Sequence, residues 1–258
     1  MGIIAWVDVI ILFESERHLW LSRHHMIAVS SPSTLVRMST SIPLNDIPAL
    51  VDRIDRLAAA SDGRVVVSVA GVPGSGKTTV ATEVVAQLNA RGIKAVALSM
   101  DGFHLYRHQL TTEEMVRRRG APFTFDQPRF VATVALLKPA YRVKPVLAPS
   151  FDHSVKDPVE DDVKIEPDVK VVVVEGNYTS LTDDGWSDIG DIVDELWFVA
   201  TPLEVAQQRL VARHLLLGVA ATVEEAQQRA SGSDYDNLVY LLNRLRAPDV
   251  VITHVDHV

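Results

Sequence analysis

The sequence predicts an α/β fold built on a mainly parallel sheet with helices on both faces. Two observations lead to this prediction. Short apolar runs of strand length alternate with longer stretches of helical periodicity, and a glycine-rich turn joins one of these strands directly to a helix. Alternation of strands and helices favours parallel pairing, because each crossover helix returns the chain to the same edge of the sheet.

The periodic part of the chain begins near Asn45. Apolar residues between positions 47 and 58 recur at helical spacing and predict the first helix, with Asn45 or Asp46 as the candidate cap. A β-branched run at 64–70 predicts a buried strand. After the glycine-rich turn we expect a helix from about Lys77 to Ala90 and a strand over 93–100.

The rest of the chain continues this alternation. The further expected strands cover 169–174, 196–200 and 248–252, and the further expected helices cover 129–137, 202–217, 223–230 and 235–246. Residues 157–168 are acidic and contain proline, which predicts a surface loop or hairpin.

The first 40 residues differ from the rest. They end in serine-rich segments that are typical of linkers, so we expect a poorly ordered extension over 1–40 and one domain over 41–258. The apolar run at 3–13 is too short to span a bilayer and contains Asp8. We therefore expect no membrane association and a cytoplasmic protein.

Composition excludes several classes of function. The chain has 258 residues, a net charge of −8 and no cysteine. An acidic chain lacks the clustered lysines and arginines on which nucleic-acid binding depends, so we expect no nucleic-acid partner. The absence of cysteine excludes a disulfide framework and thiolate metal sites. A small molecule is the expected partner, and the chain could form a homodimer.

The strongest motif is the segment GVPGSGKT at residues 71–78, which fits the pattern of glycine, four residues and Gly-Lys-Ser/Thr. In such a loop the backbone N–H groups surround phosphate oxygens at the N-terminus of a helix. Lys77 would reach the β- and γ-phosphates of ATP, and the Thr78 hydroxyl would bind Mg²⁺. The expected fold is therefore of the P-loop NTPase type. The predicted nucleotide-binding residues are Gly71, Gly74, Ser75, Gly76, Lys77, Thr78 and Thr79.

Two carboxylates stand at the carboxyl ends of predicted strands, where open α/β sheets place their ligands. Asp101 follows the strand at 93–100, and Glu175 follows the run at 169–174. Either carboxylate could serve the metal or the attacking nucleophile, since the spacing does not distinguish these roles. A turn or capping role is the alternative for each, because Asp before Gly is common in turns.

These segments together resemble the phosphoribulokinase/uridine kinase family, which includes bacterial pantothenate kinase. The resemblance covers roughly residues 45–258. It rests on the P-loop and on the segments DGFH at 101–104, RRGAPFTFD at 118–126, PSFDH at 149–153, Glu175-Gly176 and Arg209 to His214.

The resemblance implies a mechanism with ATP and Mg²⁺ as cofactors and a helical lid. Asp101 would be the general base beside the acceptor hydroxyl, and Glu175 would lie near the magnesium and its waters. The lid would bring Arg209 and Arg213 to the transferring phosphate. Phosphoryl transfer depends mainly on positioning and charge stabilisation, so these parts are sufficient.

The acceptor pocket is expected from residues scattered along the chain. Taken alone, each of them is more often structural than functional, because aromatic residues commonly form cores and histidines commonly satisfy hydrogen bonds. The segments match neither uridine kinase nor pantothenate kinase throughout, so sugars, nucleosides, pantothenate-like acids and vitamin alcohols all stay open as acceptors. The candidate residues are His104, Tyr106, Arg118, Arg119, Phe125, Asp152, His153 and Tyr178.

Three functions fit a P-loop. A kinase that transfers the γ-phosphate of ATP to a metabolite hydroxyl is favoured. A regulatory or chaperone-type nucleotide switch is the alternative, but the Asn-Lys-x-Asp segment typical of guanine recognition is missing, and the nearest segment, at 253–256, lacks the lysine. A non-catalytic nucleotide-binding module is the third, and the complete set of Lys77, Thr78, Asp101 and Glu175 argues against it.

Overall fold

The computed structural model describes residues 39–152 and 155–254, so the predictions for residues 1–38 and for His153 lie outside the described part of the chain. Six parallel strands form one sheet in the order β1-β8-β7-β2-β6-β3. This sheet confirms the predicted α/β fold. Its strands are β1 (Thr40–Pro43), β2 (Val65–Gly71), β3 (Ala95–Ser99), β6 (Val171–Gly176), β7 (Glu195–Ala200) and β8 (Val250–Thr253).

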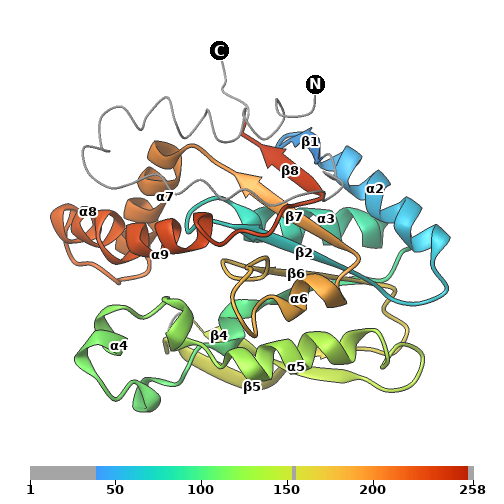
Figure 1. Cartoon of the computed structure of the whole chain (residues 1–258), viewed down its shortest axis with the longest axis horizontal. Coiled ribbons are helices and arrows are strands. Elements are labelled where there is room, and N and C mark those ends of the chain that lie inside the picture. The colour runs from blue at the N-terminus through green and yellow to red at the C-terminus, as the bar shows by residue number, and fades with distance from the viewer. Residues whose placement is uncertain (1–38, 153–154, 255–258) are drawn as a thin grey trace, which may run out of the picture.

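Helices cover both faces of the sheet (Figure 1). The apolar residues of α2 and α3 pack with one face, and those of α5 and α6 pack with the other. The helices are α2 (Ile47–Ala60), α3 (Lys77–Ala90), α4 (Glu113–Arg117), α5 (Gln127–Leu137), α6 (Asp188–Ile192), α7 (Leu203–Leu216), α8 (Val223–Ser231) and α9 (Ser233–Leu242).

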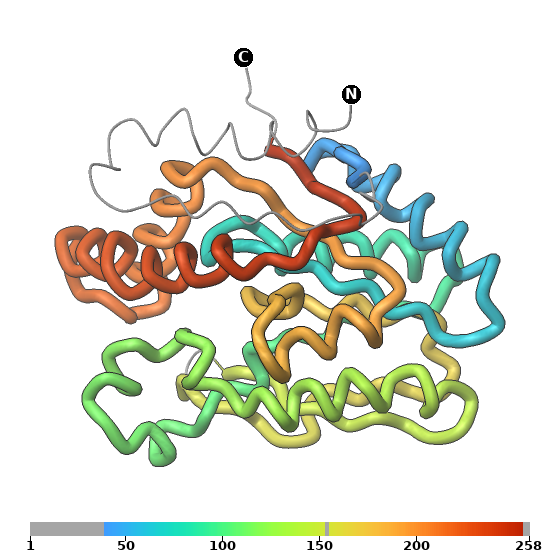
Figure 2. Tube along the Cα trace, in the orientation of Figure 1, coloured from blue at the N-terminus to red at the C-terminus, as the bar shows by residue number. Residues whose placement is uncertain are grey.

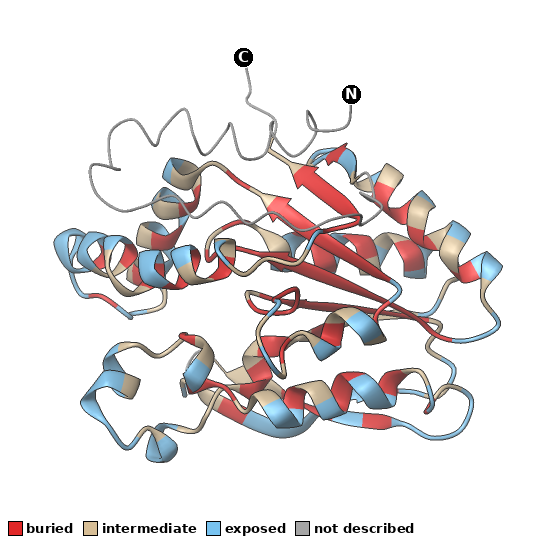
Figure 3. Cartoon of the chain, viewed as in Figure 1, coloured by how far each residue is buried: buried red, intermediate tan, exposed pale blue. Residues whose placement is uncertain are grey.

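The central strand β2 shows why this sequence forms a covered parallel sheet. Val65, Val67 and Val69 belong to the core beneath α2 and α3, whereas Val66 and Ala70 belong to the core on the opposite face. Every residue of β2 is buried, and Figure 3 shows the same for most of the strands around it. A strand buried on both faces is a continuous apolar run and does not alternate with polar residues.

A two-stranded antiparallel hairpin lies below the main sheet, next to α5 (Figure 1). It consists of β4 (Val146–Asp152) and β5 (Asp157–Ile165). The hairpin is one of the two structures predicted for residues 157–168, but its first strand was not predicted. The surface face of β5 is charged, so only the inward residues, such as Ile165, show the burial expected of a strand.

The last three helices form the predicted lid. Figure 2 shows α8 and α9 at the same end of the molecule as α4. The predicted final helix over 235–246 is shorter in the structure, because the chain after Leu242 turns to bind the loop that follows β6. There the backbone N–H of Arg246 donates to the Ser180 carbonyl, and the Arg244 carbonyl accepts from the N–H of Thr182. None of the helices in the described ranges is both long and apolar enough to cross a bilayer.

Candidate active site

The carboxyl ends of four neighbouring strands, β7, β2, β6 and β3, meet at one edge of the sheet. The turn at 72–76 follows β2 and leads into the N-terminus of α3. Thr201 follows β7, and its hydroxyl donates to the Ser75 carbonyl at 2.8 Å, which ties this turn to the neighbouring strand. An N-terminus of a helix at the end of a central strand is a site for phosphate groups.

Two glycines of the turn have backbone conformations that other residues adopt only with strain. The φ angles of Gly74 and Gly76 are 80° and 94°. A Cβ atom on Gly74 would also lie 2.4 Å from the carbonyl oxygen of Ala206 on α7, so the turn and α7 touch through their backbones. The glycines of the motif thus serve the turn and its contact with the lid.

Lys77 begins α3 and lies among the charged residues of the site. Burial lowers the pKa of its ammonium group, the carboxylates of Glu175 and Asp101 oppose that shift, and Arg213 adds to it. The same three residues are those for which the sequence predicts catalytic or metal-side roles. The fold therefore brings Lys77, Asp101, Glu175 and Arg213 into one electrostatic site.

Glu175 lies at the end of β6 and is only 3 % exposed. Its carboxylate accepts a hydrogen bond from the Thr78 hydroxyl at 3.1 Å. Burial raises the pKa of Glu175 and Asp101 raises it further, whereas Lys77 and the hydroxyls of Ser99 and Thr78 favour the ionised form. A buried carboxylate held near an ammonium group and a hydroxyl is suited to a cation.

The oxygens of Thr78 and Glu175 fit a magnesium ion that is held mainly by nucleotide phosphates and water. Mg²⁺ commonly uses only one or two protein oxygens in such sites. The described residues contain no cluster of three or more His, Cys, Asp or Glu side chains arranged to hold a metal. These two residues could therefore complete a metal site only together with a nucleotide.

Asp101 lies in a short 3₁₀ turn, Met100–Phe103, directly after β3. The Ser99 hydroxyl accepts from the Asp101 N–H at 3.3 Å and caps this turn. A Cβ atom on Gly102 would lie 2.0 Å from the Pro149 carbonyl, so the glycine permits the turn to pack on β4. Nδ1 of His104 lies 2.8 Å from the Asp101 carbonyl, which fixes the orientation of the turn.

Arg209 and Arg213 lie one turn apart on α7 and are both exposed. Arg209 donates to the Ser75 carbonyl at 3.3 Å, and the charge of Arg213 acts on Lys77. Residues four apart share a helix face, so both guanidinium groups are on the side of α7 that faces the P-loop.

The predicted acceptor residues separate into two groups. The ring of His104 stacks against Phe125 at 4.0 Å and Phe151 at 4.8 Å, one turn from Asp101. The Arg119 guanidinium also lies over the Phe151 ring, 5.6 Å from the ring centre. His104, Phe125 and Arg119 are therefore brought together near Asp101, and Asp152 ends the strand that carries Phe151.

The other predicted acceptor residues point elsewhere. Tyr178 is fully buried, its hydroxyl donates to the Gly120 carbonyl at 2.7 Å, and burial raises its pKa. The Tyr106 hydroxyl donates to Glu160 at 2.5 Å on the hairpin. Arg118 reaches the lid, where it donates to Asn237 at 3.2 Å. These contacts give Tyr178 and Tyr106 structural partners and connect Arg118 to α9.

Sequence reasoning missed several residues at this site. Thr201 follows a strand at the same edge as Asp101 and Glu175, so the rule that found those carboxylates could have found it. Asn237 and Arg229 lie on α9 and α8, and both contact the segment at 118–120. No local motif marks them, because only the folded lid brings them to that segment.

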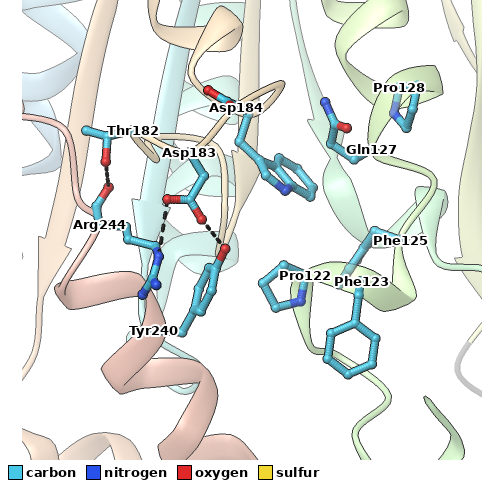
Figure 4. A pocket seen from close by; sticks show the side chains of 11 residues that line it. Pro122, Phe123, Phe125, Gln127, Pro128, Thr182, Asp183, Asp184, Tyr240 and Arg244 are labelled. Carbon is cyan, nitrogen blue, oxygen red and sulfur yellow. Dashed lines mark hydrogen bonds and ion pairs between the residues drawn. The ribbon is translucent and has the colours of Figure 1, made fainter.

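A cavity of about 760 Å³ lies apart from the P-loop (Figure 4). It opens between the turn at 122–128, the loop at 182–186 and the C-terminal end of α9. On one wall Asp183 binds the Tyr240 hydroxyl and pairs with Arg244 Nε at 3.2 Å. Burial and the hydrogen bond to Asp183 raise the pKa of Tyr240 to about 12, although Arg244 opposes this shift. Neither Lys77 nor Asp101 lines this cavity, which Phe125 separates from His104.

Comparison with known proteins agrees with this geometry. Residues 66–253 match the Phosphoribulokinase / Uridine kinase family. A Schizosaccharomyces pombe protein that is named a putative uridine kinase is 37 % identical over 195 residues, which are 73 % of this chain and 83 % of that protein. An ATP-dependent kinase-like protein of Aspergillus versicolor is 40 % identical over 159 residues, 59 % of this chain and 92 % of that protein.

A solved structure from Silicibacter sp. TM1040 has the same fold. That protein is named a putative fructose transport system kinase. It superposes with a TM-score of 0.73 at 32 % sequence identity, and the alignment covers 80 % of this chain and 98 % of that one.

Proposed function

Because the chain belongs to the phosphoribulokinase/uridine kinase family, we propose that it is a kinase that transfers the γ-phosphate of ATP to a hydroxyl group of a small metabolite. The observation that carries this proposal is the meeting of Lys77, Thr78, Glu175 and Asp101 at one edge of the sheet. This set supplies cations for the phosphates, oxygens for a metal and a carboxylate for the acceptor.

In the proposed reaction the P-loop and Lys77 hold the phosphates of ATP. Thr78 and Glu175 would hold Mg²⁺, which would supply charge neutralisation on the phosphate oxygens. Asp101 takes the proton of the acceptor hydroxyl as the acceptor oxygen attacks the γ-phosphorus. The bond from this phosphorus to the bridging oxygen of ADP breaks, and ADP leaves. The products are ADP and a phosphate monoester of the acceptor.

The lid arginines contribute to the same step. Negative charge on the transferring phosphoryl group is best met by fixed cations that need no rearrangement in the transition state. Arg209 touches the P-loop, and Arg213 acts on Lys77, so both lie on the phosphate side of the site. Lys77, Arg209 and Arg213 are therefore the proposed cations of phosphoryl transfer.

The test is ADP release from Mg-ATP with a panel of sugars, nucleosides, hydroxy acids and vitamin alcohols. We expect at least one acceptor to stimulate ADP release well above the acceptor-free rate. Lys77→Ala should remove this stimulation while circular dichroism shows the fold retained, since half-buried Lys77 belongs to neither apolar core. Stimulated ADP release that persists within about tenfold of wild type in the variant would contradict the proposed role of Lys77.

A thermal-shift comparison of ATP with GTP addresses the nucleotide-switch alternative. A ligand raises stability only where it binds, so a kinase that uses ATP should be stabilised by Mg-ATP. Stabilisation by GTP alone, without acceptor-dependent ADP or GDP release, would favour the switch.

A further inference from the structure

Orphaned polar atoms gather where the lid meets the segment at 118–120. Within the described ranges, seven buried side-chain nitrogen or oxygen atoms have no hydrogen-bond partner in the protein. Three of them are the Nε atoms of Arg118, Arg119 and Arg229. Such a group in a native structure needs an explanation, which can be local strain, a functional role, or a bound water or ion.

The three arginines lie where the lid helices α8 and α9 contact the segment at 118–120. Arg229 on α8 donates to the Arg119 carbonyl at 3.4 Å. Arg118 donates to Asn237 on α9 at 3.2 Å, and the Asn237 amide also lies close to Gly120. The lid therefore brings Arg229 and Asn237 to the segment that carries Arg118 and Arg119.

The carboxylates of the protein balance the charge of this junction only in part. Within the part of the chain that the structure describes, Arg229 has no carboxylate partner. Arg118 has one, Asp236, at 3.6 Å, but that carboxylate is more than half exposed. Arg119 is fully engaged within the protein, since it binds Asp157 and two backbone carbonyls. Arg118 and Arg229 thus leave positive charge for an anion.

The junction is close to the proposed base. Arg119 and His104 contact the same ring, that of Phe151, and Nδ1 of His104 lies 2.8 Å from the Asp101 carbonyl. On the other side, the pKa of buried Tyr178 is influenced by both Arg118 and Asp101. A small molecule whose hydroxyl reaches Asp101 could therefore extend toward the arginines.

We propose that the phosphate acceptor carries an acidic group, a carboxylate or a phosphate, which Arg118 and Arg229 bind. This inference rests on the proposed kinase function and assigns the class of its substrate. An acid that approaches Mg-ATP is repelled by the triphosphate, so it needs cations of its own apart from Lys77, Arg209 and Arg213. Arginine suits this task because its planar donors match the oxygens of both groups.

The experiment compares acceptors in pairs that differ in the acidic group. D-glycerate is compared with glycerol, pantothenate with panthenol, and ribose 5-phosphate with ribose, each by ADP release from Mg-ATP. We expect kcat/KM to be at least about tenfold higher for the acid than for its neutral counterpart in every pair that is used. A preference for the acid in the first two pairs would assign a carboxylate as the acidic group. A preference for the acid in the third pair would assign a phosphate.

Variants of the two arginines test their role with the acid that is used best. Arg229→Ala and Arg118→Ala should raise the KM for that acid about 10- to 100-fold, since each removes a charge-assisted contact. The KM for ATP and the acceptor-free rate of ATP hydrolysis should stay within about twofold. Arg229→Lys, which keeps the charge, should recover part of the loss. Arg91→Ala, which removes a surface arginine of α3, is the control and should change neither KM.

The outcomes separate this inference from the proposed function. A neutral acceptor used as well as its acid, or an unchanged KM for the acid in both arginine variants, would overturn the acidic-acceptor proposal and leave the kinase intact. If no compound is phosphorylated, the same pairs are compared by thermal shift of the Mg-ADP complex. Stabilisation by the acids that is lost in Arg229→Ala would support the arginine site although the kinase reaction failed, and no stabilisation by any acid would overturn it.

Discussion

The nucleotide half and the acceptor half of the site are built in different ways. The nucleotide half consists of one continuous turn, residues 71–79, with Glu175 and Thr201 on the strands beside it. The acceptor half joins the turn after β3, the segment at 118–125, the hairpin and the lid, which are far apart in the sequence. It also contains most of the orphaned buried atoms. The first half is encoded by residues that are close in the sequence, whereas the second is assembled only by the fold.

Asp101 is the residue that both halves share, and Asp101→Asn should produce the largest effect. Asparagine keeps the shape and one acceptor oxygen, so the turn should survive, but it cannot take the proton of the acceptor. We expect kcat for acceptor phosphorylation to fall about 10²- to 10⁴-fold. The affinity for Mg-ATP, measured by titration calorimetry, should change little.

Two other results would give Asp101 a role other than that of the general base. A loss of Mg-ATP affinity that extra Mg²⁺ partly restores would place Asp101 on the metal, in the nucleotide half. A change of no more than a few-fold in both kcat and Mg²⁺ dependence would leave it as a turn residue.

Arg213→Ala should have the next largest effect and tests whether the lid serves the nucleotide half only in the transition state. Arg213 lies near Lys77 but is exposed in the protein without ligand. We expect kcat to fall about 10- to 100-fold while the KM for ATP rises less than threefold. A raised KM for ATP at unchanged kcat would instead assign Arg213 to ground-state nucleotide binding.

Glu175→Gln should affect stability, with a sign that follows from the raised pKa of Glu175. A folded-state pKa above the unfolded value of 4.5 makes a contribution to stability that is complete below about pH 4.5 and is lost as the pH rises through the folded pKa. The ionised carboxylate therefore costs stability at neutral pH when no cation is bound.

The ligand-free Glu175→Gln protein should accordingly melt higher than wild type at pH 7. We expect a gain of about 2–4 °C for each kcal/mol relieved. The difference in Tm should narrow as the pH is lowered to 5, and the variant should bind Mg-ATP more weakly. A Tm below that of wild type at pH 7 would show that the pairing of Glu175 with Lys77 and Thr78 outweighs its burial.

Deletion of residues 1–37 should have the smallest effect. The sheet uses the chain from Thr40 onward, and the Ser39 hydroxyl donates to the Pro248 carbonyl, so a chain that begins at Met38 keeps these contacts. We expect the Tm to change by less than about 2 °C, which for a domain of this size is below 1 kcal/mol. A protein that fails to fold or loses its activity would show that the extension belongs to the domain.

The nucleotide half could be predicted because its information is local. The glycines, Lys77 and Thr78 are adjacent in the sequence, and Asp101 and Glu175 each end an apolar strand, which places them at a known edge. The acceptor half could be predicted only in part. Tyr178 is an aromatic residue beside Glu175, but whether its ring lines a pocket or fills the core depends on Gly120, 58 residues away.

Dependence on contacts between distant parts of the chain also explains why the sequence did not predict β4 and β1. β4 contains Pro149 and is only partly buried, so it lacks the alternation that marks a strand, and its register is set by pairing with β5. β1 has four residues, too few for a periodic signal, and it exists because β8 offers an edge. Arg229 lies on a polar helix surface, and only the folding of the lid against the rest of the domain brings it to Arg119.

The close contact between Gly74 and the Ala206 carbonyl gives α7 a candidate pivot point near its N-terminus. The N-terminal part of the helix packs directly on the phosphate-binding turn, so a swing of the lid that keeps this contact would pivot there. Arg213 lies seven residues beyond Ala206, about 10 Å along the helix axis at 1.5 Å per residue. A tilt of about 10° at the pivot would therefore displace its backbone by nearly 2 Å, enough to make or break a contact with a phosphate oxygen.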